Sequence, residues 1–214
     1  MPRKHITYYE VLEAFGTSEC PICNLVDKSM RQRMDALLHE QVNDPGTRRK
    51  LVESRGFCAP HSRVFLELGH PLGVALIFGD ILDAVINDLE RNSTKHTGKC
   101  PACQWAASDE SRYLSVLAAH FDDENMHDAI VNSRGFCLPH LRALMSLLSQ
   151  AQRSDLRQII ISHLVSLRSE LSEIVRKSDY RCNEPFGQER DAWIRVVEKL
   201  SGVRSADRSA LSSF

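Results

Sequence analysis

The chain has 214 residues, and its 27 Lys and Arg against 28 Asp and Glu give a net charge of −1. Apolar residues make up 43% and charged residues 26%, which is typical of a folded soluble protein and argues against global disorder. There is no basic excess or basic stripe of the kind that binds DNA or RNA, so no nucleic-acid partner is expected.

The N-terminal segment carries no predicted secretory signal, because the apolar residues between 6 and 15 are interrupted by Thr7, Glu10 and Glu13. The longest apolar stretch, residues 73–82, has about half the length that a membrane span needs. We therefore expect a cytoplasmic protein without a membrane partner. In that reducing compartment, paired cysteines are metal ligands or redox thiols more often than disulfides.

Apolar residues recur at helical spacing nearly throughout the chain. The first predicted helix, residues 8–15, is ended by Gly16, and Gly56 similarly closes a short third helix. The predicted helices cover residues 8–15, 25–42, 47–55, 60–68, 72–89, 104–121, 124–134, 138–149, 154–177 and 189–200.

The chain contains an internal duplication. Cys-Pro-Ile-Cys at 20–23 recurs as Cys-Pro-Ala-Cys at 100–103. The ten residues 54–63 recur at 133–142 with eight identical positions, in the same order relative to the first motif. The predicted organisation is an N-terminal helix (1–17), a first metal-binding repeat (18–97), a second metal-binding repeat (98–177) and a C-terminal amphipathic tail (178–214).

The fold class that follows is all-α. We expect a helical bundle of two pseudo-symmetric halves, each held by one metal ion, with the C-terminal helix docked across them.

Each repeat offers three thiols and one imidazole, as a Cys-x2-Cys pair and a Cys-x2-His pair with 34 intervening residues in the first repeat and 33 in the second. Two-residue spacing at a helix start lets both side chains of a pair converge on one ion, beside backbone N–H groups that stabilise a thiolate. Two pairs together make the closed four-ligand site that structural zinc prefers. The predicted ligands are Cys20, Cys23, Cys58 and His61 in the first repeat and Cys100, Cys103, Cys137 and His140 in the second.

The two pairs of one repeat are expected to meet in the same site, because local closure costs less chain entropy than a non-local pairing. The residues between the two pairs form about two predicted helices. One helix could lead the chain away from the first pair and the next could lead it back, so that both pairs meet at one end. The alternative is a crossed arrangement, in which the CPxC pair of one repeat meets the CxPH pair of the other.

The main functional hypothesis is a metal-binding protein with two structural zinc ions that presents a surface or groove to an unknown protein or small-molecule partner. One alternative is an iron–sulfur redox or sensor protein using the same ligands. A second is a metal-free thiol oxidoreductase that uses the CPxC pair. No catalytic residue is assigned and an enzyme is disfavoured, because a closed four-ligand site has no open position for a catalytic water.

Five further residues stand out. Arg55 and Arg134, like Arg63 and Arg142, are duplicated, and they are interpreted either as surface ion pairs or as neutralising charges near the thiolates. Cys182 is the seventh cysteine and has no counterpart; it is either a structural residue or a labile thiol.

The two motif pairs are followed by a tail with Asp-Tyr-Arg at 179–181, Glu-Pro at 184–185 and Trp193. In this combination the chain resembles a family of bacterial and archaeal proteins of unknown function. The resemblance covers nearly the whole chain. It implies that the eight Cys and His positions and the tail belong together, and it supplies no activity.

Overall fold

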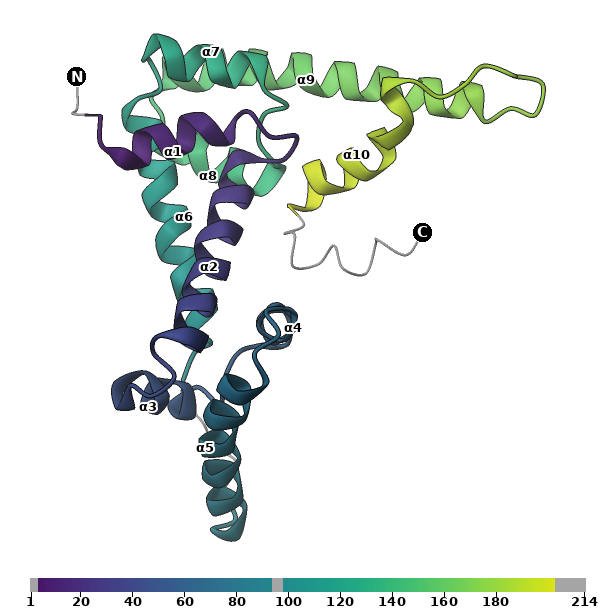
Figure 1. Ribbon diagram of the computed structural model, residues 1–214. Helices are drawn as coiled ribbons and strands as arrows, with labels where there is room; N and C mark the ends of the chain where they lie inside the picture. The colour runs from purple at the N-terminus through teal and green to yellow at the C-terminus, as the bar shows by residue number, and fades with distance from the viewer. Residues whose placement is uncertain (1–3, 94–97, 203–214) are drawn as a thin grey trace. The chain divides into compact units, whose positions relative to one another are not determined.

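The computed structural model describes residues 4–93 and 98–202, and these residues form α-helices and one short 3₁₀ helix without a β-strand (Figure 1). The predicted all-α fold class is confirmed. The helices are α1 (Ile6–Ala14), α2 (Pro21–His39), α3 (Pro45–Glu53), α4 (Ala59–Glu67), α5 (Pro71–Glu90), α6 (Pro101–Ala119), α7 (Glu124–Asn132), α8 (Leu138–Leu147), α9 (Gln150–Lys177), η1 (Gln188–Asp191) and α10 (Ala192–Ser201).

The two repeats have the same helices in the same order. The first helix of each, α2 or α6, has 19 residues, and the second, α3 or α7, has 9. The third helices have 9 and 10 residues, and the fourth have 20 and 28. The close agreement of the first three helix lengths supports the interpretation that the chain arose by internal duplication.

The chain divides into two compact units. Among the described residues, unit 1 consists of residues 4–25 and 111–202, and unit 2 consists of residues 26–93 and 98–110. The boundaries fall inside α2 and α6, so the compact units do not coincide with the repeats. The division of the sequence into repeats stays a prediction about the sequence.

The core of unit 2 lies where α2 packs against α3, α4 and α5. Its buried side chains follow helical spacing on α2 and α5, and Phe57 packs on Phe65 with ring centroids 5.0 Å apart. Asp109, at 2% side-chain exposure, accepts hydrogen bonds from Ser29 and Arg33 at 2.7 and 2.8 Å. The buried core residues are Met30, Met34, Leu37, Leu38, Leu51, Phe57, Val64, Phe65, Ile77, Ile81 and Ala102.

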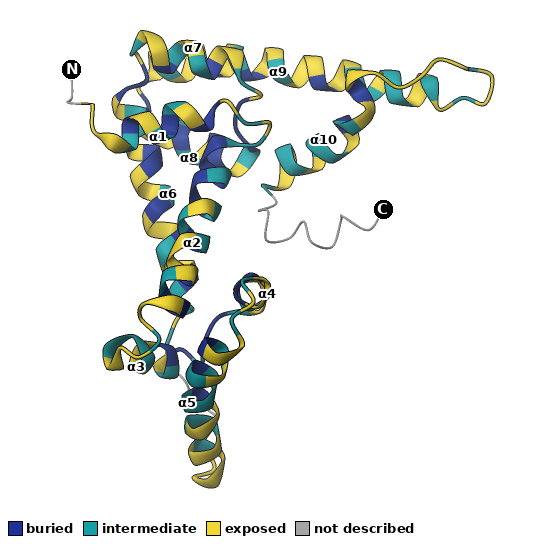
Figure 2. Ribbon diagram, in the orientation of Figure 1, coloured by how far each residue is buried: buried dark blue, intermediate teal, exposed yellow. Residues whose placement is uncertain are grey.

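In unit 1, α1 packs against α7, and α10 contacts α8 and α9 (Figure 2). Phe15, just after α1, packs edge-on against Phe136 with centroids 5.6 Å apart. The buried Tyr8 donates its hydroxyl hydrogen to Asp123 at 2.5 Å, and Lys4 pairs with the same carboxylate at 2.7 Å.

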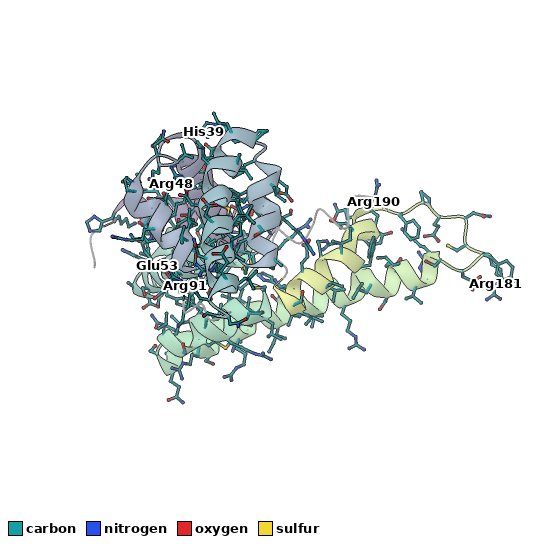
Figure 3. The ribbon with its side chains drawn as sticks, turned by 90° about the horizontal axis from the view of Figure 1, so that it is seen from below. His39, Arg48, Glu53, Arg91, Arg181 and Arg190 are labelled. Atoms are coloured by element: carbon teal, nitrogen blue, oxygen red, sulfur yellow. The ribbon has the colours of Figure 1, made fainter. Side chains whose placement is uncertain are left out.

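Local signals explain several helix boundaries. Ser149 and Gln152 form a reciprocal capping box, so α9 begins at Gln150, four residues earlier than predicted. The tail helix begins at Ala192 because the residues before it form η1. The segment from α9 to α10 carries exposed arginines, among them Arg181 and Arg190 (Figure 3).

No helix within the described part of the chain combines the length and apolar character that a membrane crossing requires.

Candidate metal centre

The structure gathers the eight predicted ligand residues into two groups of four. Group A consists of Cys20, Cys23, Cys137 and His140, all in unit 1. The Nδ1 atom of His140 lies 3.4, 3.3 and 3.0 Å from the sulfur atoms of Cys20, Cys23 and Cys137. The sulfur atoms of Cys23 and Cys137 are 3.7 Å apart.

Group B consists of Cys58, His61, Cys100 and Cys103, all in unit 2. The Nδ1 atom of His61 lies 3.1, 3.6 and 3.4 Å from the sulfur atoms of Cys58, Cys100 and Cys103. The Cys58 and Cys103 sulfur atoms are 3.7 Å apart. In each group all four ligand atoms lie within 4.8 Å of one another, so each group could hold one metal ion.

The expected pairing within each repeat is wrong. Each group joins the CPxC pair of one repeat to the CxPH pair of the other, as in the crossed alternative. Chain entropy favours local closure only weakly. Closing the separation of 114 residues between Cys23 and Cys137, instead of about 35, costs only about 1 kcal/mol more, because the cost grows with the logarithm of loop length.

Helix lengths explain why a repeat does not close its own site. The CPxC pair lies at the start of a 19-residue helix, which is about 28 Å long at 1.5 Å per residue. The next helix has only 9 residues and returns about 13 Å. The following CxPH pair therefore falls short of the start of its own first helix, and it meets the CPxC pair of the other repeat.

The ligand pairs lie at helix N-termini, as expected. Cys58 and Cys137 are the N-cap residues of α4 and α8, and each is followed by a proline in the first turn. Gly56 and Gly135 precede them with φ angles of 83° and 70°, a left-handed conformation that favours glycine. The glycines thus turn the chain sharply into each CxPH pair.

The charges in group A favour one thiolate and oppose a second. Burial opposes ionisation of Cys20, but hydrogen bonds with Cys137, Cys23 and His140 hold its pKa well below the ordinary value. The pKa of Cys23 is raised, because its hydrogen bonds with Cys137 and Cys20, burial and the neighbouring charges favour the thiol. Burial disfavours the imidazolium of His140, yet hydrogen bonds with Cys137 and Cys20 raise its pKa to about 10.

Group B likewise has one cysteine with a lowered pKa and one with a raised pKa. Burial opposes ionisation of Cys100, but hydrogen bonds from His61 and the backbone lower its pKa to about 6. Burial, a hydrogen bond with Cys58 and the charge of Cys100 raise the pKa of Cys103 to about 12. Three thiols so close together ionise jointly only beside a cation, which is the condition that a bound metal ion supplies.

The groups differ in their exposure to solvent. In group A, Cys23, Cys137 and His140 are buried, whereas in group B Cys103 is exposed and only His61 is buried.

The C-terminal helix covers part of group A. A Cβ atom added to Gly202 at the end of α10 would lie 3.3 Å from the Cys137 sulfur. Burial lowers the pKa of Lys199 on the same helix, while charge on Cys20 and Cys137 opposes that shift. Sequence reasoning missed Lys199, because the amphipathic pattern of α10 does not indicate what the helix packs against.

Of the duplicated arginines, one pair forms ion pairs and the other pair is exposed on helix surfaces. Arg55 pairs with Asp88, and Arg134 lies 3.7 Å from Asp191. Arg63 and Arg142 are exposed on α4 and α8. The first interpretation, ion pairing and solvation near helix ends, fits these positions.

Cys182 belongs to neither group. It is half-buried after α9, where Arg176 donates to its sulfur at 3.8 Å.

A family model described as a family of unknown function (DUF6062) matches residues 2–99 and again residues 86–207. The chain belongs to this family. The predicted membership of an uncharacterised family is confirmed, and each match contains one CPxC and one CxPH pair. Comparison with curated proteins and with solved structures gives no match.

Proposed function

We propose that the protein binds two zinc ions, one in group A and one in group B, and that both ions are structural. Three cysteine sulfurs and one histidine nitrogen form a closed ligand set of the type that structural zinc sites use. Because no fourth position is left for water or substrate, the proposed role is stabilisation rather than catalysis.

The separations between ligand atoms support a single tetrahedral ion. With Zn–S bonds of about 2.3 Å and Zn–N bonds of about 2.0–2.1 Å, a tetrahedron has S···S edges of about 3.8 Å and S···N edges of about 3.5 Å. In each group one S···S separation is 3.7 Å and the three S···N separations lie between 3.0 and 3.6 Å. All four ligand atoms of each group lie within 4.8 Å of one another. This agreement in both groups is the observation that carries the proposal.

The same crowding argues against an iron–sulfur cluster as the first choice. A cluster lies between its ligands, and those ligands bind to different iron atoms, so they stand farther apart than the ligands of one ion. All four ligand atoms of each group lie within 4.8 Å of one another. The iron–sulfur cluster is therefore the second hypothesis, and the metal analysis described below distinguishes it from zinc.

The structural role follows from which segments each ion would join. Each ion would connect the first helix of one repeat to the third helix of the other. Apparent zinc-binding energies of about 10–16 kcal/mol match or exceed the ~5–15 kcal/mol net stability of a typical domain. We infer that the metal-free chain loses much of its helical structure.

The wider role that we propose is a cytoplasmic interaction module for a protein or small-molecule partner. A reducing compartment keeps the thiolates available for metal, which supports the location. Nucleic acid is a poor candidate partner, because the net charge is −1.

Elemental analysis and native mass spectrometry of anaerobically purified protein test the proposal. Two zinc ions per colourless chain are expected, and Cys182→Ser, outside both groups, should keep both. A brown protein that contains iron and sulfide would refute the zinc proposal and support the iron–sulfur hypothesis. A folded, metal-free protein with reactive CPxC thiols would favour the oxidoreductase hypothesis.

A further inference from the structure

Helix α5 has two apolar faces, and only one of them is buried. Ile77 and Ile81 lie in the core of unit 2, whereas much of the remaining helix is exposed (Figure 2). The outer face repeats apolar or small residues at alternating spacings of three and four, the pattern of a coiled-coil seam. We call this face the α5 seam; its residues are Leu72, Ala75, Gly79, Leu82, Ile86 and Leu89.

The large side chains of the α5 seam are strongly exposed. Leu72, Leu82, Ile86 and Leu89 are 68%, 60%, 52% and 59% exposed. Together they present roughly 400 Å² of apolar surface, which is as large as the largest patch on a typical monomer. Two such faces in contact would bury on the order of 1,000 Å² in all, about the lower limit for a specific interface.

Gly79, near the middle of the seam, has no local packing role. A Cβ atom added there would have nothing within 4 Å, although glycine weakens the interior of a helix relative to alanine. A glycine at a seam position lets the backbone of a second helix approach closely. The glycine and the exposed leucines on either side therefore indicate the same missing partner.

The α5 seam is complementary to a second copy of itself. Its positions are symmetric about the point between Asp80 and Ile81, so an antiparallel pair places Gly79 opposite the second copy's Leu82. By the same symmetry Ala75 faces Ile86, and the two outermost leucines face each other. Small residues thus meet large ones, whereas a parallel pair would set Gly79 against Gly79 and leave a void.

We propose that the chain forms an antiparallel homodimer through the α5 seam. Helix α5 carries no Lys or Arg, and Asp83 adjoins the seam. Antiparallel pairing brings the two Asp83 side chains to the same edge, where like charges repel. Salt screens this repulsion and strengthens the dimer, whereas salt would weaken the contact with a basic partner helix.

Sedimentation equilibrium of the full metal-loaded chain tests the proposal. The expected species is a reversible dimer of the 24.2 kDa chain whose dissociation constant falls as salt rises. Leu82→Glu should raise the dissociation constant about 30-fold or more, as the loss of a central anchor does. Val175→Glu changes a residue with 75% exposure on α9 and should leave the dimer intact.

The antiparallel register has its own test. Gly79→Leu fills open space in the monomer but clashes with Leu82 of the second copy, so the dimer should weaken. Gly79→Leu combined with Leu82→Ala restores a large residue opposite a small one and should recover dimerisation. Metal content and far-ultraviolet circular dichroism verify that each variant is folded.

A wild-type chain that stays monomeric at all concentrations would overturn the proposal. So would a dimer that tolerates Leu82→Glu, or that Gly79→Leu strengthens, as parallel pairing requires. A monomer that captures a basic amphipathic helical peptide, with weaker capture at high salt, would assign the seam to a different partner.

Discussion

The crossed arrangement of the ligands makes a sharp prediction for two double variants. Cys20→Ser/Cys137→Ser removes two ligands from group A and leaves group B complete, so the chain should keep one zinc ion. Cys20→Ser/Cys58→Ser removes one ligand from each group, so both zinc sites should be weakened. Each variant lacks two thiols, which makes them matched controls for each other.

The size of the effect follows from the number of ligands. If a complete site contributes about 10–16 kcal/mol, one of its four ligands accounts for about 3–4 kcal/mol, or a 100- to 1,000-fold change in affinity. A chelator chosen to leave both ions in the wild type should then strip both from Cys20→Ser/Cys58→Ser. It should leave one in Cys20→Ser/Cys137→Ser.

Native mass spectrometry after chelator treatment counts the ions, and circular dichroism reports whether each variant is folded. Ligand sets confined to single repeats require the reverse result: one ion kept by Cys20→Ser/Cys58→Ser and both weakened in the other variant. That result, with both chains folded, would refute the crossed arrangement and the helix-length argument behind it.

Three further outcomes are expected. A colorimetric chelator should remove metal from group B first, because Cys103 is exposed. Cys58→Ser/Cys103→Ser, which removes two ligands from group B, should abolish the fast phase of release. A fast phase that persists in this variant would contradict the assignment. Gly56→Ala and Gly135→Ala should each lower stability by about 1 kcal/mol through backbone strain. Thermal unfolding should show that Gly135→Ala loses about 1–3 kcal/mol more stability than Gly56→Ala. The Cβ atom added at Gly135 would lie 2.8 Å from the His163 ring nitrogen on α9, whereas the atom nearest to a Cβ at Gly56 is 3.4 Å away. Equal losses in the two variants would contradict this packing argument. Hydrogen bonds with Lys4 and Tyr8 lower the pKa of Asp123 from 3.8 to about 2, so its contribution to stability is present above about pH 4 and is lost as pH falls toward 2. The stability difference between wild type and Asp123→Asn in denaturant titrations should therefore shrink below pH 4, and a difference that does not change with pH would contradict it.

Much of the fold follows from local patterns in the sequence. Apolar spacing located the helices, and each ligand pair lies at a helix start. Those starts were predictable because Pro60 and Pro139 suit a first turn, and because Gly56 and Gly135 suit the residue after a helix end. The start of α9 lies four residues before the predicted start, because the capping box of Ser149 and Gln152 begins the helix ahead of its apolar spacing.

The pairing of the ligands was not predicted, although the information needed lay in the helix lengths. The predicted helices 25–42 and 47–55 already differ twofold in length, so they could not lead out and return to the same point. Loop entropy favours local closure by only about 1 kcal/mol, which is too small to decide between the two arrangements. Rigid helix lengths impose a stronger constraint than loop entropy.

The covering of group A by α10 depends on contacts that no local pattern encodes. The helix has an amphipathic sequence, but nothing in that sequence states that Lys199 lies near Cys20 and Cys137. The same limit applies to the α5 seam, because heptad spacing is visible in the sequence while its exposure is not. Both features require knowledge of which face of the helix is already buried.

The crossed groups give the duplication a physical reason. One repeat carries one complete set of ligand types, but its helix lengths keep its own two pairs apart. With two repeats, both groups are completed, because the CPxC pair of each repeat meets the CxPH pair of the other. Neither group is then complete without both repeats, so the metal binding that we propose would depend on the association of the two halves. Joining the repeats in one chain makes that association intramolecular and independent of protein concentration.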